Sequence, residues 1–358
     1  MIKTTFDKEA AYRKQIDPDR LCKYGVDFLD EALTCILPND LVVIGAESGA
    51  GKSELSLQIA AYNAKRGKKV ALFFLEGGDV EAMARMKWKD LCMLYKMKHE
   101  NSYMPVNYVE WRTNRYSDPS VCSEFASLER ELGNKYNILY GENLYIPEIN
   151  GEFTLNSLIS GLWDYHTLEF AIKTGKQYNL DLIIIDHLQY FDLVDETHEI
   201  QATTKILKEC KRISDIAGVP VVLVSHLRKM GKDSGLPSHE DFYGTGNISK
   251  IASTAIMISR DNSQSDYSRD YYYTYFRVVK SRIGLSSNYA AKLIFDGKTR
   301  DYKKEYELYL VNRSGYVAND PIEHNKMPRW AKSARGKMSE HEQAVTEIRN
   351  PEKANWND

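Results

Sequence analysis

Residues 41–53, LVVIGAESGAGKS, join a continuously apolar run to a turn that is rich in glycine. A stretch with helical patterning, LSLQIAAYNA (55–64), follows almost at once. A buried strand, a glycine-containing turn that ends in Lys-Ser, and a helix are the parts of a phosphate-binding loop, in which backbone N–H groups surround the phosphates of a nucleotide. The stretch therefore predicts an α/β domain that binds a nucleoside triphosphate.

The residue types of this loop fit that chemistry. Gly49 and Gly51 allow the backbone to approach the phosphates, Lys52 can reach the β and γ oxygens, and Ser53 can bind Mg²⁺. A small residue, Ala46, replaces the glycine that usually begins the motif. The alternative is a βα turn with an incidental lysine. We expect ATP and Mg²⁺ as cofactors, and nucleotide contacts from Ala46, Glu47, Ser48, Gly49, Ala50, Gly51, Lys52, Ser53 and Glu54.

Further apolar runs predict the rest of the fold. Short apolar runs of residues that favour strands recur at 70–75, 182–185, 221–224 and 255–259, with helical patterns between them. Continuously apolar strands separated by helices indicate a parallel sheet that is covered on both faces. Beyond Tyr271, three polar-apolar runs follow one another with only turn signals between them, which predicts antiparallel strands at one edge of the sheet.

Composition narrows the class of protein but leaves its partner open. The net charge of the 358 residues is only −2, so any nucleic-acid surface must be local. The five cysteines form no CxxC or Cys/His pattern, which argues against structural zinc and a disulfide scaffold. No run approaches the roughly 18 apolar residues that span a bilayer. We expect a cytoplasmic protein with no membrane contact.

The chain divides into a central domain with two flanking segments. Residues 1–24 are polar and helix-prone and predict an arm or linker, with a frayed terminus as the alternative. Residues 25–319 form the expected ATPase domain, in which 91–140 predict helical decoration. Residues 320–358 lose their apolar periodicity and predict a polar tail.

The tail carries a periodic set of cations. If it were helical, a basic stripe would run along it; the alternative is a disordered tail in which Trp330 anchors a protein partner. The stripe consists of Lys326, Arg329, Lys332, Arg335 and Lys337.

Two acidic residues follow predicted strands. Glu76 comes after the run at 70–75, and Asp186 comes after the run at 182–185. Ligands of open α/β sheets bind where parallel strands end, and a site that hydrolyses a nucleotide needs carboxylates for Mg²⁺ and for a water molecule. The alternative is that each acid only caps the next helix.

The order of these motifs resembles a known family. GVDFLDEAL, PNDLVVIGAESGAGKSELSLQIA, GKKVALFFLEGGDVEAMARM, LDLIIIDHLQYF, GVPVVLVSHLRK, GTGNISKIASTAIMISRD and VVKSR follow one another as in the ATPase domain of DnaB-type replicative ring helicases, within the RecA-like superfamily. The resemblance covers roughly residues 24–300 and implies a RecA-like P-loop core. A small residue in place of the first loop glycine is typical of that family.

The resemblance also implies roles for individual residues. Glu76 matches the catalytic base, Asp186 the Mg²⁺-associated acid, and His226 the polar sensor of the γ-phosphate. Without the resemblance, a histidine after a buried strand would more often be a structural hydrogen-bonding residue.

Lys280 and Arg282 match the pair of cations that such ring enzymes insert into a neighbouring subunit's site. Residues two apart on a strand share one face, so both could reach the same γ-phosphate. The alternative is an exposed strand face with two solvated cations. The resemblance implies a homo-oligomer, expected to be a hexamer, that is catalytic only when assembled.

The segment at 228–247 follows the predicted strand that ends before His226. RecA-like rings hold single-stranded nucleic acid in loops at this position, with backbone amides and basic side chains. Tyr243 and Gly244 stand where these helicases usually carry an arginine and a glutamate, so DNA binding would rest on other groups. The candidates are Arg228, Lys229, Lys232, Tyr243 and Gly246.

Two functions remain open on these grounds. The first is an ATP-hydrolysing, hexameric, helicase-like motor that translocates on single-stranded DNA. The second is a RecA-like switch that assembles with ATP and recruits other proteins without unwinding. Tyr243 and Gly244 favour the switch, whereas His226, Lys280 and Arg282 favour the motor. A kinase is disfavoured because nothing resembles a lid that binds a phosphate acceptor.

Overall fold

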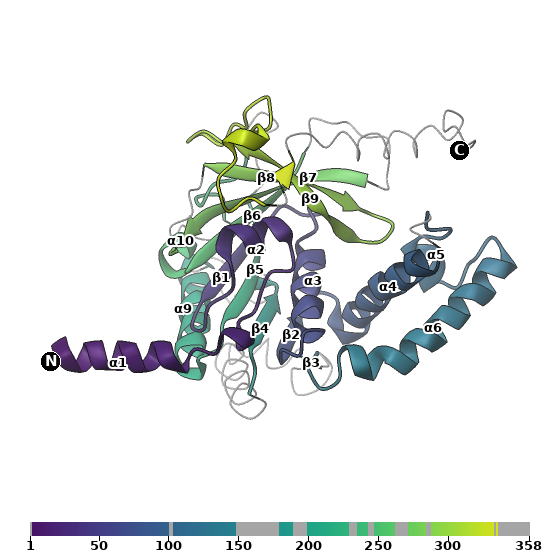
Figure 1. Cartoon of the computed structure of the whole chain (residues 1–358), viewed down its shortest axis with the longest axis horizontal. Coiled ribbons are helices and arrows are strands. Elements are labelled where there is room, and N and C mark those ends of the chain that lie inside the picture. The colour runs from purple at the N-terminus through teal and green to yellow at the C-terminus, as the bar shows by residue number, and fades with distance from the viewer. Residues whose placement is uncertain are drawn as a thin grey trace.

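The computed structural model describes residues 2–99, 103–147, 179–188, 199–228, 235–242, 247–261, 271–283, 288–332 and 334–335. These residues form one ten-stranded sheet with helices on both faces (Figure 1). The strand order is β10-β9-β8-β7-β6-β1-β5-β4-β2-β3. The P-loop strand β1 therefore lies in the interior of the sheet.

The strands from β6 to β3 pair in parallel. Each one predicted from an apolar run is present, and the very short β3 extends the edge beyond β2. A parallel arrangement brings the carboxyl ends of these strands to the same edge. Their bounds are β1 Leu41–Ala46, β2 Val70–Phe74, β3 Leu144–Tyr145, β4 Leu182–Asp186, β5 Val221–His226 and β6 Thr254–Arg260.

Antiparallel strands complete the other edge. β7 Tyr271–Ser281 pairs with β6, and β8 Tyr289–Asp296 and β9 Asp301–Leu310 follow as a meander. The short strand β10 Ala334–Arg335 pairs with β9 in parallel. The predicted fold class, a mostly parallel α/β sheet with antiparallel strands at one edge, is confirmed.

Helices cover both faces of the parallel part, whose five longer strands are mainly buried and apolar. On β1, Val42 and Ile44 face the core beneath α3 Lys52–Ala64 and α2 Asp27–Leu33. Leu41 and Val43 face the opposite core, which α9 Glu199–Ala217 and the single turn α10 Ile248–Ile251 close. This double burial explains why these strands are continuous apolar runs.

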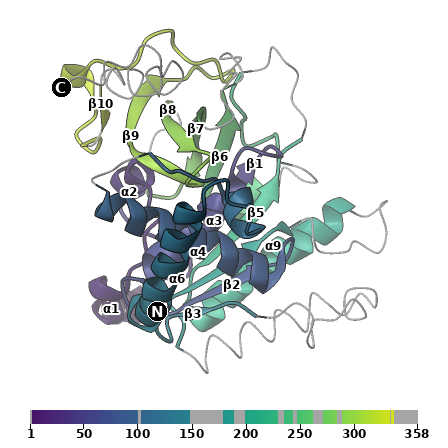
Figure 2. The ribbon, with the colours of Figure 1, turned by 90° about the vertical axis from the view of Figure 1, so that its right-hand side faces the viewer.

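A helical layer lies outside α3 (Figure 2). It consists of α4 Gly78–Lys98, α5 Tyr108–Arg112 and α6 Pro119–Leu139. The layer has its own apolar cluster around the fully buried Trp88, which packs against Trp111 and Phe125. Trp88 also donates a hydrogen bond of 2.7 Å to the Lys298 carbonyl oxygen, so the layer is tied to the antiparallel strands.

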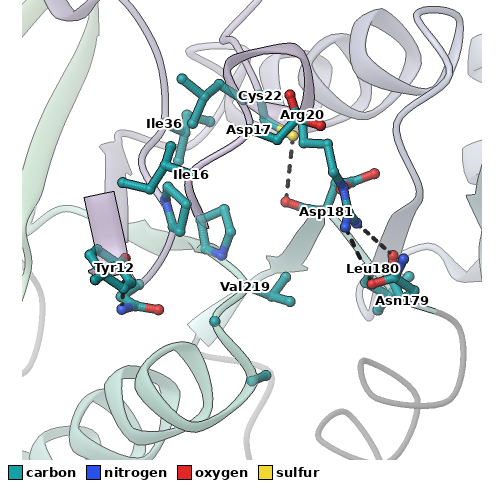
Figure 3. Close-up of a pocket in the computed structure, with 16 residues that line it drawn as sticks. Tyr12, Ile16, Asp17, Arg20, Cys22, Ile36, Asn179, Leu180, Asp181 and Val219 are labelled. Atoms are coloured by element: carbon teal, nitrogen blue, oxygen red, sulfur yellow. Dashed lines mark hydrogen bonds and ion pairs between the residues drawn. The ribbon is translucent and has the colours of Figure 1, made fainter. Parts of the chain in front are cut away.

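The amino-terminal arm forms a helix, α1 Ile2–Gln15, that extends away from the body of the molecule (Figure 1). After the 3₁₀ turn η1 Pro18–Arg20, the chain is anchored to the domain, because Arg20 Nε donates a 2.6 Å hydrogen bond to Asp181 Oδ1. Figure 3 shows Arg20 reaching Asp181 and Asn179 across a cavity between the arm and the domain. The arm is therefore anchored to the domain at Arg20, after the end of α1, and most residues of α1 are exposed.

The carboxy-terminal end of the described chain packs on the domain. The Trp330 ring lies 6.0 Å from the Phe28 ring and 5.7 Å from the Tyr289 ring, and Ala331 is buried. Residues beyond the boundary expected at 319 thus contribute to the packed domain.

The tail forms no α-helix in the part that the structure describes, so the condition for a basic stripe is not met there. Lys326 ends the 3₁₀ turn η4 His324–Lys326, and Arg335 lies on β10. Between them the described chain forms turns and bends, because Pro328 and the packing of Trp330 interrupt a helix. Lys337 lies outside the described residues.

No helix within the described ranges combines the length and the apolar composition that crossing a membrane requires.

Candidate nucleotide-binding site

The glycine-rich loop connects the end of β1 to the start of α3, as predicted. Ala46 is the last residue of β1, and α3 begins at Lys52. Gly49 and Gly51 have φ values of 80° and 91°, which L side chains rarely adopt. A side chain at Gly51 would also collide with the Tyr302 hydroxyl, 2.2 Å from an ideal Cβ position. Both glycines are therefore required by the shape of the loop.

A cavity opens above this loop. Its wall includes Phe74, Gly77, Tyr272 and Phe295 in addition to Glu76, Arg85, Gly297 and Arg300, and from the loop it includes Ser48, Gly49, Gly51, Lys52, Ser53 and Glu54. Ala46 and Ala50 are buried beneath it, and Glu47 is half-buried. The cavity in Figure 3 lies at the opposite edge, where the parallel strands begin. The cavity at the carboxyl edge is the one where open α/β sheets bind ligands.

The predicted acid and lysine meet in this cavity. Lys52 Nζ lies 3.7 Å from Glu76 Oε2, and Lys52 is 8% exposed whereas Glu76 is 53% exposed. His187 Nε2 lies 3.4 Å from the same carboxylate oxygen. The carboxylate is thus placed between a buried cation and an imidazole while remaining open to solvent, as a group that must hold a water molecule requires.

Asp186 lies at the end of β4, beneath the loop. Its Oδ2 accepts a 2.8 Å hydrogen bond from Ser56, which sequence reasoning missed. Burial raises the pKa of Asp186, although hydrogen bonds from Ser56 and Ser53 and the charge of Lys52 act in the opposite direction.

The surroundings of Asp186 fit Mg²⁺. Its Oδ1 is buried without a hydrogen-bond partner in the described structure, and oxygen ligands of this kind suit Mg²⁺. Among the described residues, no group of three or more His, Cys, Asp or Glu side chains could hold a metal by itself. Mg²⁺ typically binds to one or two protein oxygens together with the phosphates of its nucleotide. Ser53 and Asp186 are the residues that would hold it here.

His226 ends β5 beside the strand of Asp186. Its ring packs edge to face on His187, with centroids 4.6 Å apart. Burial, together with the charges of Lys52 and His187, lowers the pKa of His226 to about 4. The residue is therefore a neutral hydrogen-bonding group near pH 7, adjacent to the cluster of Lys52, Glu76 and His187.

The structure does not bring Lys280 and Arg282 into this cavity. β7 runs antiparallel to β6, so its end at Ser281 pairs with Thr254, where the parallel strands begin. Lys280 Nζ donates a 2.6 Å hydrogen bond to the Ala252 carbonyl oxygen, and the Arg282 amide bonds to Ser253. Both cations lie at the edge of the sheet opposite the glycine-rich loop.

The candidate nucleic-acid residues are only partly described. Arg228 is exposed and lies two residues after the end of β5, and its amide donates a 2.8 Å hydrogen bond to the Asp241 carbonyl oxygen. Lys229, Lys232, Tyr243, Gly244 and Gly246 lie outside the described residues.

Sequence reasoning missed several residues around the loop. His187 directly follows Asp186, so its place in the motif IIIDH could have indicated it. Ser56 lies one helical turn after Ser53, a spacing that places both on one face of α3. Nothing in the sequence indicated Tyr302 or Arg300, which reach the loop from the antiparallel strands.

Comparison with known protein families finds a match over part of the chain. Residues 160–304 match the model of the "DnaB-like helicase C terminal domain". This range includes Asp186, His226, Lys280 and Arg282, whereas the glycine-rich loop and Glu76 precede it.

Curated relatives are distant. The chain is 25% identical over 254 residues to the replicative DNA helicase DnaB of Pasteurella multocida, which covers 69% of this chain and 48% of that protein. It is 23% identical over 299 residues to the Haemophilus influenzae DnaB, covering 79% of this chain and 57% of that protein. The chain thus spans about half the length of the curated relatives it matches.

Solved structures share the fold. One solved ATPase domain superposes with a TM-score of 0.60 at 17% identity, covering 84% of this chain and 98% of that chain. A DnaB-like replicative helicase, solved with its interactions with primase, superposes with a TM-score of 0.57 at 17% identity, covering 78% of this chain and 60% of that chain. At this identity, the likeness identifies the RecA-like fold alone.

Proposed function

We propose that this chain hydrolyses ATP and that a hexameric ring of identical subunits uses the energy to translocate on single-stranded DNA in the cytoplasm. The match of residues 160–304 to the DnaB-like helicase C terminal domain and the similarity to curated DnaB helicases support this proposal. The observation that carries the proposal is the meeting of Lys52, Glu76 and His187 at the carboxyl edge of the sheet, next to Asp186.

Each of these groups has a distinct chemical role. Lys52 would neutralise the β and γ phosphates, and Ser53 with Asp186 would hold Mg²⁺, which supplies further charge neutralisation when bound. Glu76 would orient the attacking water and accept its proton, while His187 keeps the carboxylate in place. Neutral His226 would detect the γ-phosphate through a hydrogen bond. Because His226 ends β5, two residues before Arg228, a change in this hydrogen bond could move the candidate DNA-binding segment at 228–247.

The position of Lys280 and Arg282 supports a site that is shared between subunits. They cannot reach the cavity of their own subunit, since they lie at the opposite edge of the sheet. In a ring, that edge of one subunit could face the cavity of the next. An arginine supplied in this way stabilises the charge that develops on the transferred phosphoryl group.

The test is steady-state ATP hydrolysis with and without single-stranded DNA, at low and moderate salt, together with the mass measured by light scattering. The motor predicts rings that form with ATP and a hydrolysis rate that rises with DNA and falls with salt. Arg228→Ala should reduce the stimulation, whereas Arg212→Ala, which removes an exposed arginine on α9, should not. Absence of ATP hydrolysis in the presence of DNA would refute the proposal.

A second function is favoured by one departure from the helicase pattern. Tyr243 and Gly244 occupy the places where these helicases usually carry an arginine and a glutamate. An ATP-dependent recruitment switch would need the nucleotide site and the shared cations but no grip on a moving strand. ATP-dependent assembly that shows no response to DNA would select this function.

A further inference from the structure

The residue that follows the Mg²⁺-binding serine is unusual for a phosphate site. Glu54 is a carboxylate with a side chain only 5% exposed, and it borders the nucleotide cavity. A bare negative charge beside the phosphates would oppose nucleotide binding. The effect of Glu54 on nucleotide binding therefore depends on the charges around it.

Cationic side chains enclose Glu54. Arg85 Nη1 lies 3.2 Å from Oε1, Lys89 Nζ lies 3.4 Å from Oε2, and Arg300 Nε donates a 2.9 Å hydrogen bond to Oε1. A second donor of Arg300, Nη2, also binds this oxygen. Burial would raise the pKa of Glu54, but the charges of Lys89, Arg300 and Arg85 outweigh burial and lower the pKa. Glu54 therefore stays ionised, and positive charge exceeds negative charge in the cluster.

Arg300 reaches this cluster from a distant part of the chain. It is the last residue of the loop between β8 and β9, and Asp296 Oδ1 accepts hydrogen bonds from the Lys298 and Thr299 amides within that loop. Arg300 has a φ of 58°, in the left-handed region that costs energy for a residue with a Cβ. Glycine or asparagine would fit this position with less strain. The strain is consistent with a requirement for the guanidinium itself.

The guanidinium has capacity left for a ligand. Glu54 occupies Nε and one N–H of Nη2, and the guanidinium carbon lies 4.8 Å from the centre of the Tyr108 ring. Within the described structure, Nη1 has no hydrogen-bond partner. The side chain is 26% exposed and lines the cavity. Glu54 thus fixes the direction of Arg300 and leaves at least one donor available, which is how an ion pair orients a binding group.

The chemistry of the loop limits which part of the nucleotide Arg300 can bind. Amides of the glycine-rich loop would surround the α and β phosphates, Lys52 would reach the β and γ phosphates, and Ser53 would bind Mg²⁺. Arg300 lines the same cavity and is bonded to Glu54, the residue after Ser53 in the first turn of α3. The α-phosphate is the one for which the loop supplies no cationic side chain.

We propose that Arg300, oriented by Glu54, binds the α-phosphate of the nucleotide within its own subunit. This inference rests on the proposed function, because it requires that the cavity binds ATP. The contact would be common to ATP and ADP, since both carry the α-phosphate. It would be independent of Arg282 from the neighbouring subunit, which acts on the γ-phosphate.

The experiment measures the dissociation constants of ATP and ADP for the full chain by calorimetry. Arg300→Gln should weaken both nucleotides by about tenfold to a hundredfold, as expected for the loss of a hydrogen bond between charged groups, and by the same factor. Arg300→Lys, which keeps the charge without the fork of donors, should fall between Arg300→Gln and the wild type. Lys303→Gln is the matched control, because it removes a cation from the same hairpin outside the cavity.

The outcomes separate this inference from the proposed function. If the wild type and Lys303→Gln bind neither nucleotide, the proposed function fails. If both bind and Lys52→Ala does not, but Arg300→Gln binds as tightly as the wild type, only this inference fails. A loss confined to ATP would place the contact at the γ-phosphate and overturn the assignment.

Folding is checked by circular dichroism and thermal unfolding of each variant. Should Arg300→Gln not fold, the double variant Glu54→Gln/Arg300→Gln carries the same test, because it removes both partners of the Glu54–Arg300 ion pair together. The double variant should lose affinity for both nucleotides by a similar factor. Wild-type affinity in a folded double variant would refute the inference.

Discussion

The Tyr302 hydroxyl lies 3.2 Å from the carbonyl oxygens of both Ala50 and Gly51, the residues that precede Lys52 in the glycine-rich loop. Burial raises the pKa of Tyr302 well above its ordinary value, so the hydroxyl keeps its proton and donates it to these carbonyls. A strand of the antiparallel edge thereby supports the nucleotide loop from below.

We expect Tyr302→Phe to weaken ADP binding by about twofold to tenfold, the equivalent of one hydrogen bond of roughly 0.5–1.5 kcal/mol that holds the loop in its binding shape. The measurement is ADP affinity together with thermal unfolding. Tyr306→Phe is the control, since its hydroxyl donates to Glu31 rather than to the loop. Equal affinities for the Tyr302 variant and the wild type would show that the loop keeps its shape without this support.

Glu76→Gln should separate binding from hydrolysis. The amide keeps the size of the side chain but cannot accept the proton of the attacking water, so we expect kcat to fall by about 10²–10⁴-fold while ATP affinity stays within a few-fold. Lys52→Ala should lose ATP binding and all nucleotide-dependent activity. Single-turnover hydrolysis and calorimetry distinguish the two. Hydrolysis at the wild-type rate by Glu76→Gln would remove this residue from the mechanism.

Arg282→Ala should lose hydrolysis by about 10³-fold or more without losing ATP binding, because its side chain lies at the sheet edge opposite its own cavity and would act on a neighbour's nucleotide. Mixing Arg282→Ala subunits with Lys52→Ala subunits should restore part of the activity, since some junctions then combine an intact loop with an intact arginine. A monomeric Arg282→Ala protein that hydrolyses ATP normally would exclude a shared site.

His226 should respond to acid in a defined direction. Its pKa falls to about 4 in the folded protein, against about 6.5 in an unfolded chain. As pH decreases from 6.5 to 4, the unfolded state takes up the proton first, so His226 progressively lowers the stability of the folded state over this range. At pH 7 the contribution is absent.

Comparing the urea stability of the wild type and His226→Gln between pH 4 and pH 7.5 tests this. As the pH decreases, the free energy of unfolding of His226→Gln should rise relative to that of the wild type, because glutamine does not titrate. The same variant should retain hydrolysis better than His226→Ala, since a neutral amide can replace the hydrogen bond of a neutral imidazole. A constant difference in stability across the pH range would contradict the lowered pKa.

Much of the fold could be predicted because its parallel strands are buried on both faces. A strand such as β4 Leu182–Asp186 is then a continuous apolar run, which identifies it without reference to its neighbours. The strands β3 and β10 were not predicted, since two residues each carry no periodicity. The regular spacing of Lys326 and Arg329 would form a basic stripe only on a helix, and the described chain forms turns here, with Trp330 packed on Phe28.

Local sequence predicted the parts of the candidate site that depend on residue type: the strand, the glycine turn, Lys52 and Ser53, Glu76 after β2, and Asp186 at the end of β4. These follow from residue type and from backbone conformations that only neighbouring residues control. The tertiary structure decided which distant groups meet. Tyr302 beneath Ala50, Arg300 on Glu54, and the separation of Arg282 from its own cavity all depend on strand order and direction, because contacts across a sheet are set by pairing and not by proximity along the chain.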